Sequence, residues 1–144
     1  MMEVLVLLKI KMEALIMIKN QNVSYRTPRV LTHGQVVKCR GYIEKEIIIH
    51  VKAGYKSFTV KDIFGYDNWD WSKQHPDIQC IYDAWVKKYT NLHPEWTCDE
   101  VYDEAYKQAG ISLGHLFKQA ARNIMCYTFK ISNPSGWNIV YKVV

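Results

Sequence analysis

Four polar side chains recur along one stretch of the sequence at the spacing of a single helix face. They are His115, Lys118, Gln119 and Arg122, at positions i, i+3, i+4 and i+7. Their side chains can donate hydrogen bonds to phosphates and base edges, and no carboxylate stands among them. The stripe therefore predicts contact with a nucleic acid.

An apolar stripe in the same stretch would hold the polar one in place. Leu113, Leu116, Phe117 and Ala120 repeat at the same spacing, which is typical of the core-facing side of a helix. We expect one helix over residues 112–123, packed through this stripe and presenting the polar stripe outward.

A second candidate surface is the acidic and aromatic segment from Tyr66 to Trp71. We expect a surface loop that docks its tryptophans on the core, although Asp67 and Asp70 could instead hold a metal. If exposed, Trp69 and Trp71 would be natural anchors of a protein interface. The segment is therefore the alternative, protein-binding site, made of Asp67, Trp69, Asp70 and Trp71.

An internal repeat, His-Pro-acid-x-x-Cys, supplies a third candidate. Its two copies contribute His75 with Cys80 and His93 with Cys98. Imidazole and thiolate are preferred ligands of zinc, so the four residues form a candidate zinc site. Each copy also works as a helix entry, because proline and an acid suit the first turn of a helix. We favour the helix entries and expect no cofactor.

Signals for catalysis are few. The sequence has no phosphate-cradling glycine-rich loop, no HExxH and no GxSxG motif. His50 and Cys39 could pair across a hairpin as base and nucleophile, but a half-buried strand histidine without a catalytic role is the simpler interpretation. We expect a protein that is not an enzyme.

The charge is distributed unevenly along the 144 residues. The net charge of +5 divides into +6 for residues 1–56, −6 for residues 57–106 and +5 for residues 107–144. The last segment contains no carboxylate, which suits a polyanionic partner. Short basic segments are also common in proteins with no such partner.

The cysteines and the N-terminal residues indicate where the protein works. The four widely spaced cysteines include no CxxC pair and no secretory signal precedes them, so we expect free thiols and a cytoplasmic location. The longest uncharged run among the first residues, Val4 to Leu8, is too short to span a bilayer. We expect no membrane association.

The first residues have two interpretations. Met12, Glu13 and Ala14 can be encoded with a GGAGG sequence at a ribosome-binding distance from Met17. Translation would then start at Met17, and residues 1–16 would be a leader or a misassigned start. The alternative is an ordinary edge strand or helix.

The N-terminal part, residues 17–60, is expected to be rich in β structure. Residues 36–40 and 46–52 hold many β-branched side chains, and residues 41–45 can form the hairpin turn between them. A third strand is expected at residues 57–60. Because proline cannot donate a backbone hydrogen bond, Pro28 restricts residues 23–31 to an edge strand or an arm.

The remaining residues, 61–144, are expected to be helical and to end in a hairpin. A helical turn should end at Gly65, and a helix should run from about residue 77 to residue 89. Thr97 and Glu100 form a capping box that starts a further helix, which should stop at Gly110. In the following hairpin two apolar faces alternate, joined by a loop at residues 132–136. The alternating residues are Met125, Tyr127, Phe129 and Ile131, then Trp137, Ile139, Tyr141 and Val143.

The order of three helices and a hairpin resembles a winged helix-turn-helix domain over about residues 57–143. The turn at residues 108–112 looks like that of many bacterial helix-turn-helix proteins. An FTxKDxF…LGxxFxK layout, from Phe58 to Phe64 and from Leu113 to Lys118, also looks like small phage and plasmid families. The resemblance implies a recognition helix at residues 112–123 and a wing tip at residues 130–138.

The fold expected from these elements is α+β, with a small antiparallel β sheet or hairpin before a winged-helix-like unit, in one compact domain. The first functional hypothesis is a non-catalytic, regulatory nucleic-acid-binding protein of bacterial or phage origin, either as one chain or as a homodimer, with duplex nucleic acid as partner. Its expected contacts are Lys107, His115, Lys118, Gln119, Arg122, Asn123 and Lys130.

The alternative hypothesis belongs to another class. It is a phage-encoded inhibitor whose acidic segment, from Asp62 to Glu104, binds a host protein or ribonucleoprotein, such as a nucleic-acid-guided defence complex. The first hypothesis expects lost DNA binding when Lys118 and Arg122 become Glu, whereas this one expects Trp69→Ala or Asp70→Lys to break the complex.

Overall fold

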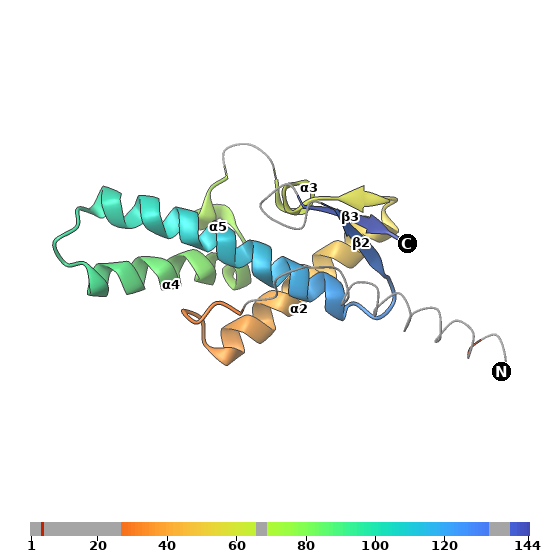
Figure 1. The fold of residues 1–144 in the computed structure, drawn as a ribbon, viewed down its shortest axis with the longest axis horizontal. Helices are drawn as coiled ribbons and strands as arrows, with labels where there is room; N and C mark the ends of the chain where they lie inside the picture. Colours follow the sequence, from red (N-terminus) through yellow and green to blue (C-terminus); the bar gives the residue numbers. More distant parts are fainter. Residues whose placement is uncertain (1–3, 5–26, 66–68, 133–138) are drawn as a thin grey trace.

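The computed structural model describes residue 4 and residues 27–65, 69–132 and 139–144. The proposed leader at residues 1–16 therefore lies, apart from residue 4, outside the described residues, as do Asp67 and most of the expected wing tip. The described chain is α+β, mostly helical, with one small antiparallel sheet (Figure 1). The expected fold class is confirmed at this level.

Residues 36–52, expected as two strands and a turn, lie within a single helix, α2 (His33–Lys52). The β-branched content suggested strands, but the buried residues Val36, Cys39, Ile43 and Ile47 follow a helical repeat of three and four. Thr32 caps the helix by a capping box with Gln35. The prediction of a β-rich N-terminal part was wrong because burial along one face outweighs β propensity.

The next elements agree with their predictions more closely. Strand β1 (Ser57–Phe58) is followed by the short helix α3 (Val60–Phe64), which ends at Gly65 as expected. Gly65 has a φ of 114°, a conformation that only glycine adopts without strain. A 3-10 turn, η1 (Trp71–Lys73), leads into helix α4 (Pro76–Leu92), which contains the expected helix at residues 77–89.

Helix α5 (Cys98–Asn123) begins at the expected capping box of Thr97 and Glu100 but does not stop at Gly110. The expected helix-turn-helix turn is therefore wrong. Ala109, Gly110, Ser112 and Leu113 are all buried in the middle of the continuous helix. A glycine there costs about 1 kcal/mol relative to alanine. The burial of the apolar residues that follow it in α5 offsets this cost.

Ser112 shows most directly why the helix continues. A separate helix was expected to start at this residue, but its hydroxyl donates to the carbonyl oxygen of Gln108, one turn earlier, at 2.9 Å. The same hydroxyl accepts the indole N–H of Trp85 on α4, also at 2.9 Å. Ser112 thus connects the two helices at mid-length.

The C-terminal hairpin forms as expected, although its first strand starts later. Strand β2 (Phe129–Ser132) pairs antiparallel with β3 (Val140–Val143), and β1 pairs with the other edge of β3. The sheet order is therefore β1-β3-β2. Phe129, Ile131, Ile139 and Tyr141 are buried, whereas Met125, expected on the same face, precedes the strand and is exposed.

One hydrophobic core joins α2, the inner ends of α4 and α5, and the sheet. Phe117 of α5 contacts Phe58 and Tyr141 of the sheet, with ring centroids 6.1 and 5.0 Å apart. The outer ends of α4 and α5 extend past α2 as a two-helix projection (Figure 1). No helix among the described residues is both long and apolar enough to cross a membrane.

The helical state of residues 33–52 predicts the effect of Gly41→Ala. Gly41 lies mid-helix, and a Cβ added there meets no atom within 4 Å. We expect the free energy of unfolding to rise by about 0.5–1 kcal/mol, and Tm by about 2–4 °C, because glycine is unfavourable inside a helix. Gly54→Ala is the control and should destabilise, since Gly54 has a φ of 109°. Destabilisation by Gly41→Ala would support the hairpin turn instead.

The unbroken α5 predicts opposite tolerances for aspartate at two sites. Aspartate is a favoured N-cap residue, so Thr97→Asp should change stability by less than about 0.5 kcal/mol. Ser112→Asp should cost about 2 kcal/mol or more, because it buries a charge in mid-helix and replaces the hydroxyl that donates to the Gln108 carbonyl oxygen by a carboxylate, which cannot donate. Urea unfolding of both variants measures the difference. Equal tolerance at the two positions would show that Ser112 is an N-cap.

Candidate functional site

The polar stripe predicted to face solvent on residues 112–123 does not do so. Lys118 and Gln119 are buried, with 5% and 8% of their surface exposed. Gln119 accepts a hydrogen bond from Arg40 of α2 at 3.4 Å and donates one to Thr27 at 3.3 Å. Burial lowers the pKa of the Lys118 ammonium. These two side chains belong to the packing between helices.

The other predicted nucleic-acid contacts lie apart from one another. His115 and Arg122 are half-buried, whereas Lys107, Asn123 and Lys130 are exposed. Lys107 precedes Asn123 by roughly 24 Å along α5, and Lys130 lies on β2. The structure does not bring the seven residues to one face, so nucleic-acid binding stays a prediction that needs a different arrangement of contacts.

The described part of the acidic and aromatic segment, residues 69–71, packs against the core as expected of a docked loop. Trp71 is buried, with 3% exposed, and Trp69 is half-buried. Trp71 stacks on Tyr82 of α4 with ring centroids 5.9 Å apart, and Trp69 meets Trp71 edge-on at 5.2 Å. The tryptophans are thus not freely exposed anchors. Both tryptophans line a hollow in the surface.

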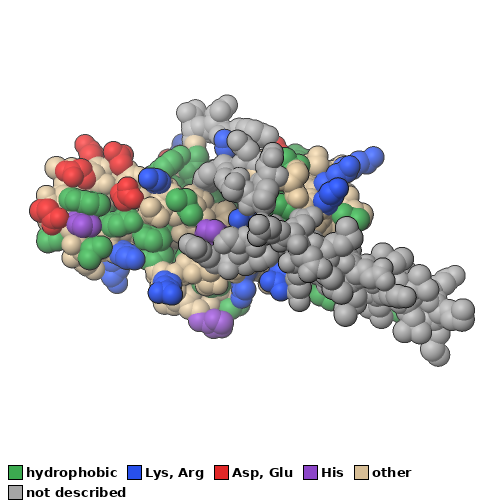
Figure 2. Space-filling view, in the orientation of Figure 1, with side chains coloured by type: hydrophobic (Ala, Val, Ile, Leu, Met, Phe, Trp, Pro, Cys, Tyr) green, Lys and Arg blue, Asp and Glu red, His purple; other side chains and the backbone are tan. Residues whose placement is uncertain are grey.

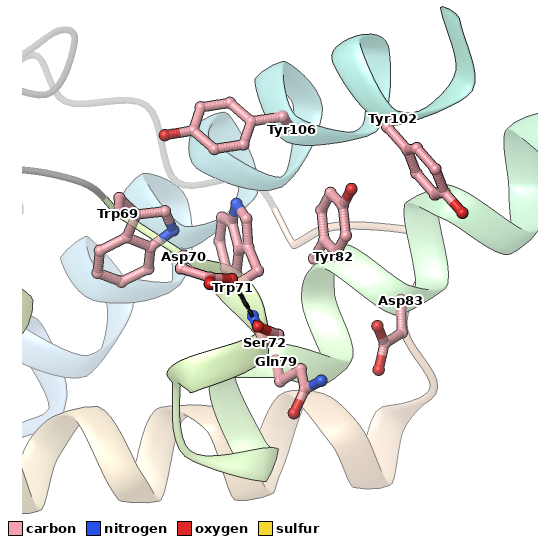
Figure 3. Close-up of a pocket in the computed structure, with 9 residues that line it drawn as sticks. All are labelled: Trp69, Asp70, Trp71, Ser72, Gln79, Tyr82, Asp83, Tyr102 and Tyr106. Atoms are coloured by element: carbon pink, nitrogen blue, oxygen red, sulfur yellow. Dashed lines mark hydrogen bonds between the residues drawn. The ribbon is translucent and has the colours of Figure 1, made fainter. Parts of the chain in front are cut away.

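That hollow is a pocket of about 500 Å³ between the segment at residues 69–72 and helices α4 and α5 (Figure 3). Its size lies within the range of ordinary ligand sites. Five of its nine residues are aromatic and two are acidic. The lining residues are Trp69, Asp70, Trp71, Ser72, Gln79, Tyr82, Asp83, Tyr102 and Tyr106. We call this hollow the aromatic pocket.

Two carboxylates, Asp70 and Asp83, line the aromatic pocket. The hydroxyl and backbone N–H of Ser72 both donate to Asp70, at 2.6 and 2.9 Å, and these bonds lower the pKa of its carboxyl. Burial raises the pKa of Tyr82, and Tyr102 and the carboxylates of Asp83, Asp103 and Asp70 raise it further. Three carboxylates therefore act on Tyr82 at close range, and such a concentration of negative charge favours a cationic ligand.

A second feature adjoins the pocket. Residues 86–105, the outer ends of α4 and α5 with their connection, carry five Asp/Glu and two Lys, a net charge of −3. We call them the acidic arm. Carboxylates gather at this end of the molecule (Figure 2), where Glu95, Asp99, Glu100 and Asp103 are exposed. Only Val101 and Ala105 are buried hydrophobic residues here, so little of the arm serves the core.

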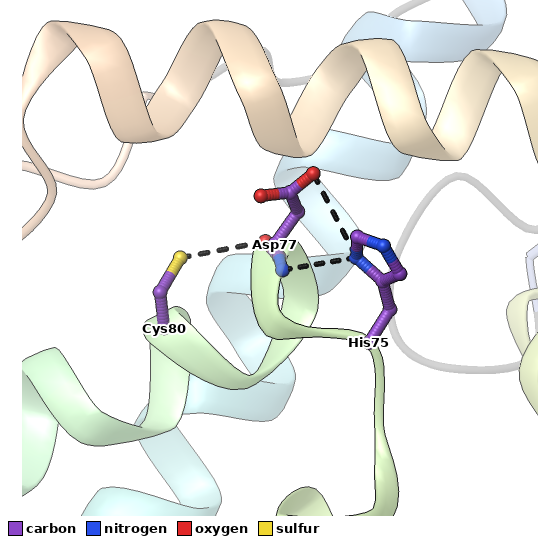
Figure 4. Close-up of polar contacts among 3 residues, drawn as sticks. All are labelled: His75, Asp77 and Cys80. Carbon is purple, nitrogen blue, oxygen red and sulfur yellow. Dashed lines mark hydrogen bonds and ion pairs between the residues drawn. The ribbon is translucent and has the colours of Figure 1, made fainter.

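The four residues of the candidate zinc site do not meet. His75 caps the start of α4 and His93 caps its end, roughly 27 Å away along the helix axis. At the start of α4, the backbone of Asp77 makes hydrogen bonds with both His75 and Cys80. Its N–H donates to His75 at 3.1 Å and its carbonyl oxygen accepts from Cys80 at 3.4 Å (Figure 4). The first copy thus builds the expected helix entry, with Pro76 and Asp77 in the first turn of α4. The expectation is wrong for the second copy, because α5 begins at Cys98 after its cap Thr97, so Pro94 and Glu95 lie in the connection before the helix.

No other metal cluster is found within the part of the chain that the structure describes: no three His, Cys, Asp or Glu side chains gather there as ligands. Asp70, considered as a metal ligand with Asp67, instead caps η1 through Ser72. Asp67 itself lies outside the described residues.

The pairing of Cys39 with His50 across a hairpin is also wrong, because both residues lie on α2, three turns apart. Cys39 is fully buried. Burial first, then Cys80 and Asp77, raise the pKa of its thiol to about 12 against the opposing effect of Arg40. A thiol that stays protonated at neutral pH is a poor nucleophile.

Sequence reasoning missed the helical part of the aromatic pocket, which consists of Gln79, Tyr82, Asp83, Tyr102 and Tyr106. A signal for it existed. Each copy of the internal repeat is followed by a Tyr-Asp pair, Tyr82-Asp83 and Tyr102-Asp103. Because α4 and α5 run antiparallel and in contact, the pairs from the two copies come together across the hairpin.

The described residues therefore provide the aromatic pocket and a charged projection, joined along α4 and α5. No protein-family model, curated protein or solved structure matches this chain. The arrangement of its own residues is accordingly the basis for a functional assignment.

Proposed function

We propose that this chain is a non-catalytic binding protein that docks on a basic surface of a partner protein through the acidic arm. The observation that carries the proposal is the concentration of exposed carboxylates on the one part of the described fold that extends beyond the core. Charge complementarity of this kind steers association and selects partners.

The arrangement of the acids goes beyond what the helix itself needs. Asp99 and Glu100 lie in the first turn of α5, where they complement the helix dipole. Asp103 and Glu104 lie one turn further, where that benefit has faded. Each faces a like charge at i−4, which costs the helix about 0.2–0.5 kcal/mol per pair. A basic partner would relieve this repulsion.

The partner class follows from the same charges. A protein that binds nucleic acid presents a cleft lined with Lys and Arg, and an acidic projection can occupy that cleft in place of the phosphates. Nucleic-acid-guided defence complexes hold their heteroduplex in a positively charged channel. An inhibitor of such a complex is the specific form of the proposal.

A second candidate, nucleic-acid binding, is favoured by one observation on the sheet. Lys130 of β2 lies directly opposite Lys142 of β3, and both side chains are exposed. Like charges directly opposite each other destabilise a sheet, and a phosphate between them would relieve the repulsion. In this version the sheet makes the contacts, and Lys130 keeps the phosphate-binding role predicted from the sequence.

Reversing charge on the acidic arm should weaken binding to a basic probe. We expect Asp99→Lys combined with Asp103→Lys to weaken binding of fluorescein-labelled nona-arginine by about tenfold at about 50 mM NaCl, because two exposed attractive charges become repulsive. Fluorescence anisotropy measures the affinity. The control, Glu44→Lys with Glu46→Lys on α2, alters net charge equally and should have a much smaller effect. Equal losses in the two variants would contradict a role for the arm.

The two candidates separate on duplex DNA. The acidic-arm proposal expects no retention of a random-sequence duplex in a gel shift at about 50 mM NaCl. The sheet candidate expects retention that Lys130→Glu with Lys142→Glu abolishes and that the arm variant leaves intact. Retention with that pattern would replace the first proposal by the second, whereas absence of retention removes the second.

A further inference from the structure

We infer that the aromatic pocket receives the side chain of an arginine from the partner protein. The inference rests on the proposed function and names the group that is recognised. Its basis is the combination of aromatic faces and carboxylates around one hollow, at the base of the acidic arm.

The aromatic side chains offer faces on which a planar cation can stack. Tyr102 and Tyr106 are one turn apart on α5 and both line the pocket, with the Tyr106 ring extending toward the tryptophans and the Tyr102 ring toward Asp83 (Figure 3). They are 48% and 49% exposed although both are large and partly apolar. Tyr82 and Trp69 lie across from them in the lining. A guanidinium within about 6 Å of such a ring is attracted by the negative charge of the ring face.

Two carboxylates stand on separate elements of the lining. Asp70 belongs to the segment before η1, where Ser72 fixes its orientation by two hydrogen bonds. Asp83 is exposed on α4. Burial raises the pKa of Tyr82, and nearby groups that include Asp83 and Asp70 raise it further, as expected where carboxylates lie close together.

Arginine suits this arrangement better than lysine does. A guanidinium is planar, stacks on aromatic rings and directs five N–H donors outward in a fixed plane, so it can stack and bond to carboxylates at the same time. An ammonium is compact and strongly hydrated, and gains less from a ring face. The pocket volume of about 500 Å³ also leaves room for residues that flank the arginine.

The walls of the aromatic pocket are held in place before any ligand arrives. An aromatic series leads from the core to the pocket: Phe117 contacts Phe64 at 6.2 Å, Phe64 contacts Trp69 at 6.5 Å, and Trp69 contacts Trp71. Trp71 in turn stacks on Tyr82. A preorganised site loses little free energy to ordering when it binds.

The test is a titration followed by the indole N–H signals in proton–nitrogen NMR spectra. The probe is an acetylated and amidated peptide, Gly-Ser-Arg-Ser-Gly, and the comparison peptide replaces arginine by neutral citrulline of nearly the same shape. We expect the signals of Trp69 and Trp71 to shift with the arginine peptide, while those of Trp85 and Trp96 stay in place. The citrulline peptide should leave all of them unchanged.

Matched variants separate the pocket from the general charge of the arm. Asp83→Asn and Tyr102→Leu should each lower the affinity for the arginine peptide by about two- to fivefold. Asp99→Asn removes the same charge from the arm outside the pocket and should change the affinity by much less. Tyr55→Leu is the control for loss of an exposed tyrosine. Unchanged indole positions in the free variants verify that each is folded.

Several results would overturn the inference. Absence of shifts at Trp69 and Trp71, equal binding of the citrulline peptide, or equal binding of a lysine peptide would each do so. Equal losses for Asp99→Asn and Asp83→Asn would leave the proposed function standing and reject the pocket as its arginine site. Conversely, the arginine peptide could bind in the pocket while the charge reversals on the arm leave the affinity for nona-arginine unchanged. That result would reject the proposed function alone.

Discussion

Unbroken hydrogen bonding along α5 is the constraint on which the rest of the structure depends. The inner half of this helix carries Leu113, Leu116, Phe117 and Ala120 into the core, and the outer half carries the acids and tyrosines away from it. Ser112 fixes the junction by accepting the Trp85 indole. A turn at this point would separate the core from the projection, and Tyr102 and Tyr106 would lose their fixed position relative to Trp69.

The continuous helix also decides which polar groups are available to a partner. Lys118 and Gln119 lie where α5 packs on the rest of the fold, so their polar character serves the packing. The carboxylates lie where α5 has only α4 beside it. The inner parts of α4 and α5 thus pack in the core, and their outer parts carry the exposed charge. The aromatic pocket lies at the boundary between these parts.

Local signals in the sequence predicted local structure well. The Thr97–Glu100 capping box, the glycine at the end of α3 and the alternation of Phe129 and Ile131 depend on neighbouring residues, and each was found. Signals whose outcome depends on packing were misjudged. Residues 33–52 have β-branched side chains yet bury a helical stripe, and Gly110 looks like a helix end yet is buried mid-helix. Trp69 and Asp70 were identified from the sequence as candidate site residues. The pocket residues of α4 and α5 were not, because they meet through contacts between the two helices that residue spacing along the sequence does not show.

The most direct measurement of the central claim is the backbone conformation of residues 109–112 in the intact protein. NMR chemical shifts of Cα and the carbonyl carbon, with amide exchange at Gly110 and Ile111, report it residue by residue. The account predicts helical shifts without a gap from Cys98 to Asn123, and slow exchange at the buried Gly110. Non-helical shifts at Gly110, with fast exchange on both sides, would contradict it and return residues 112–123 to the role of a separate helix.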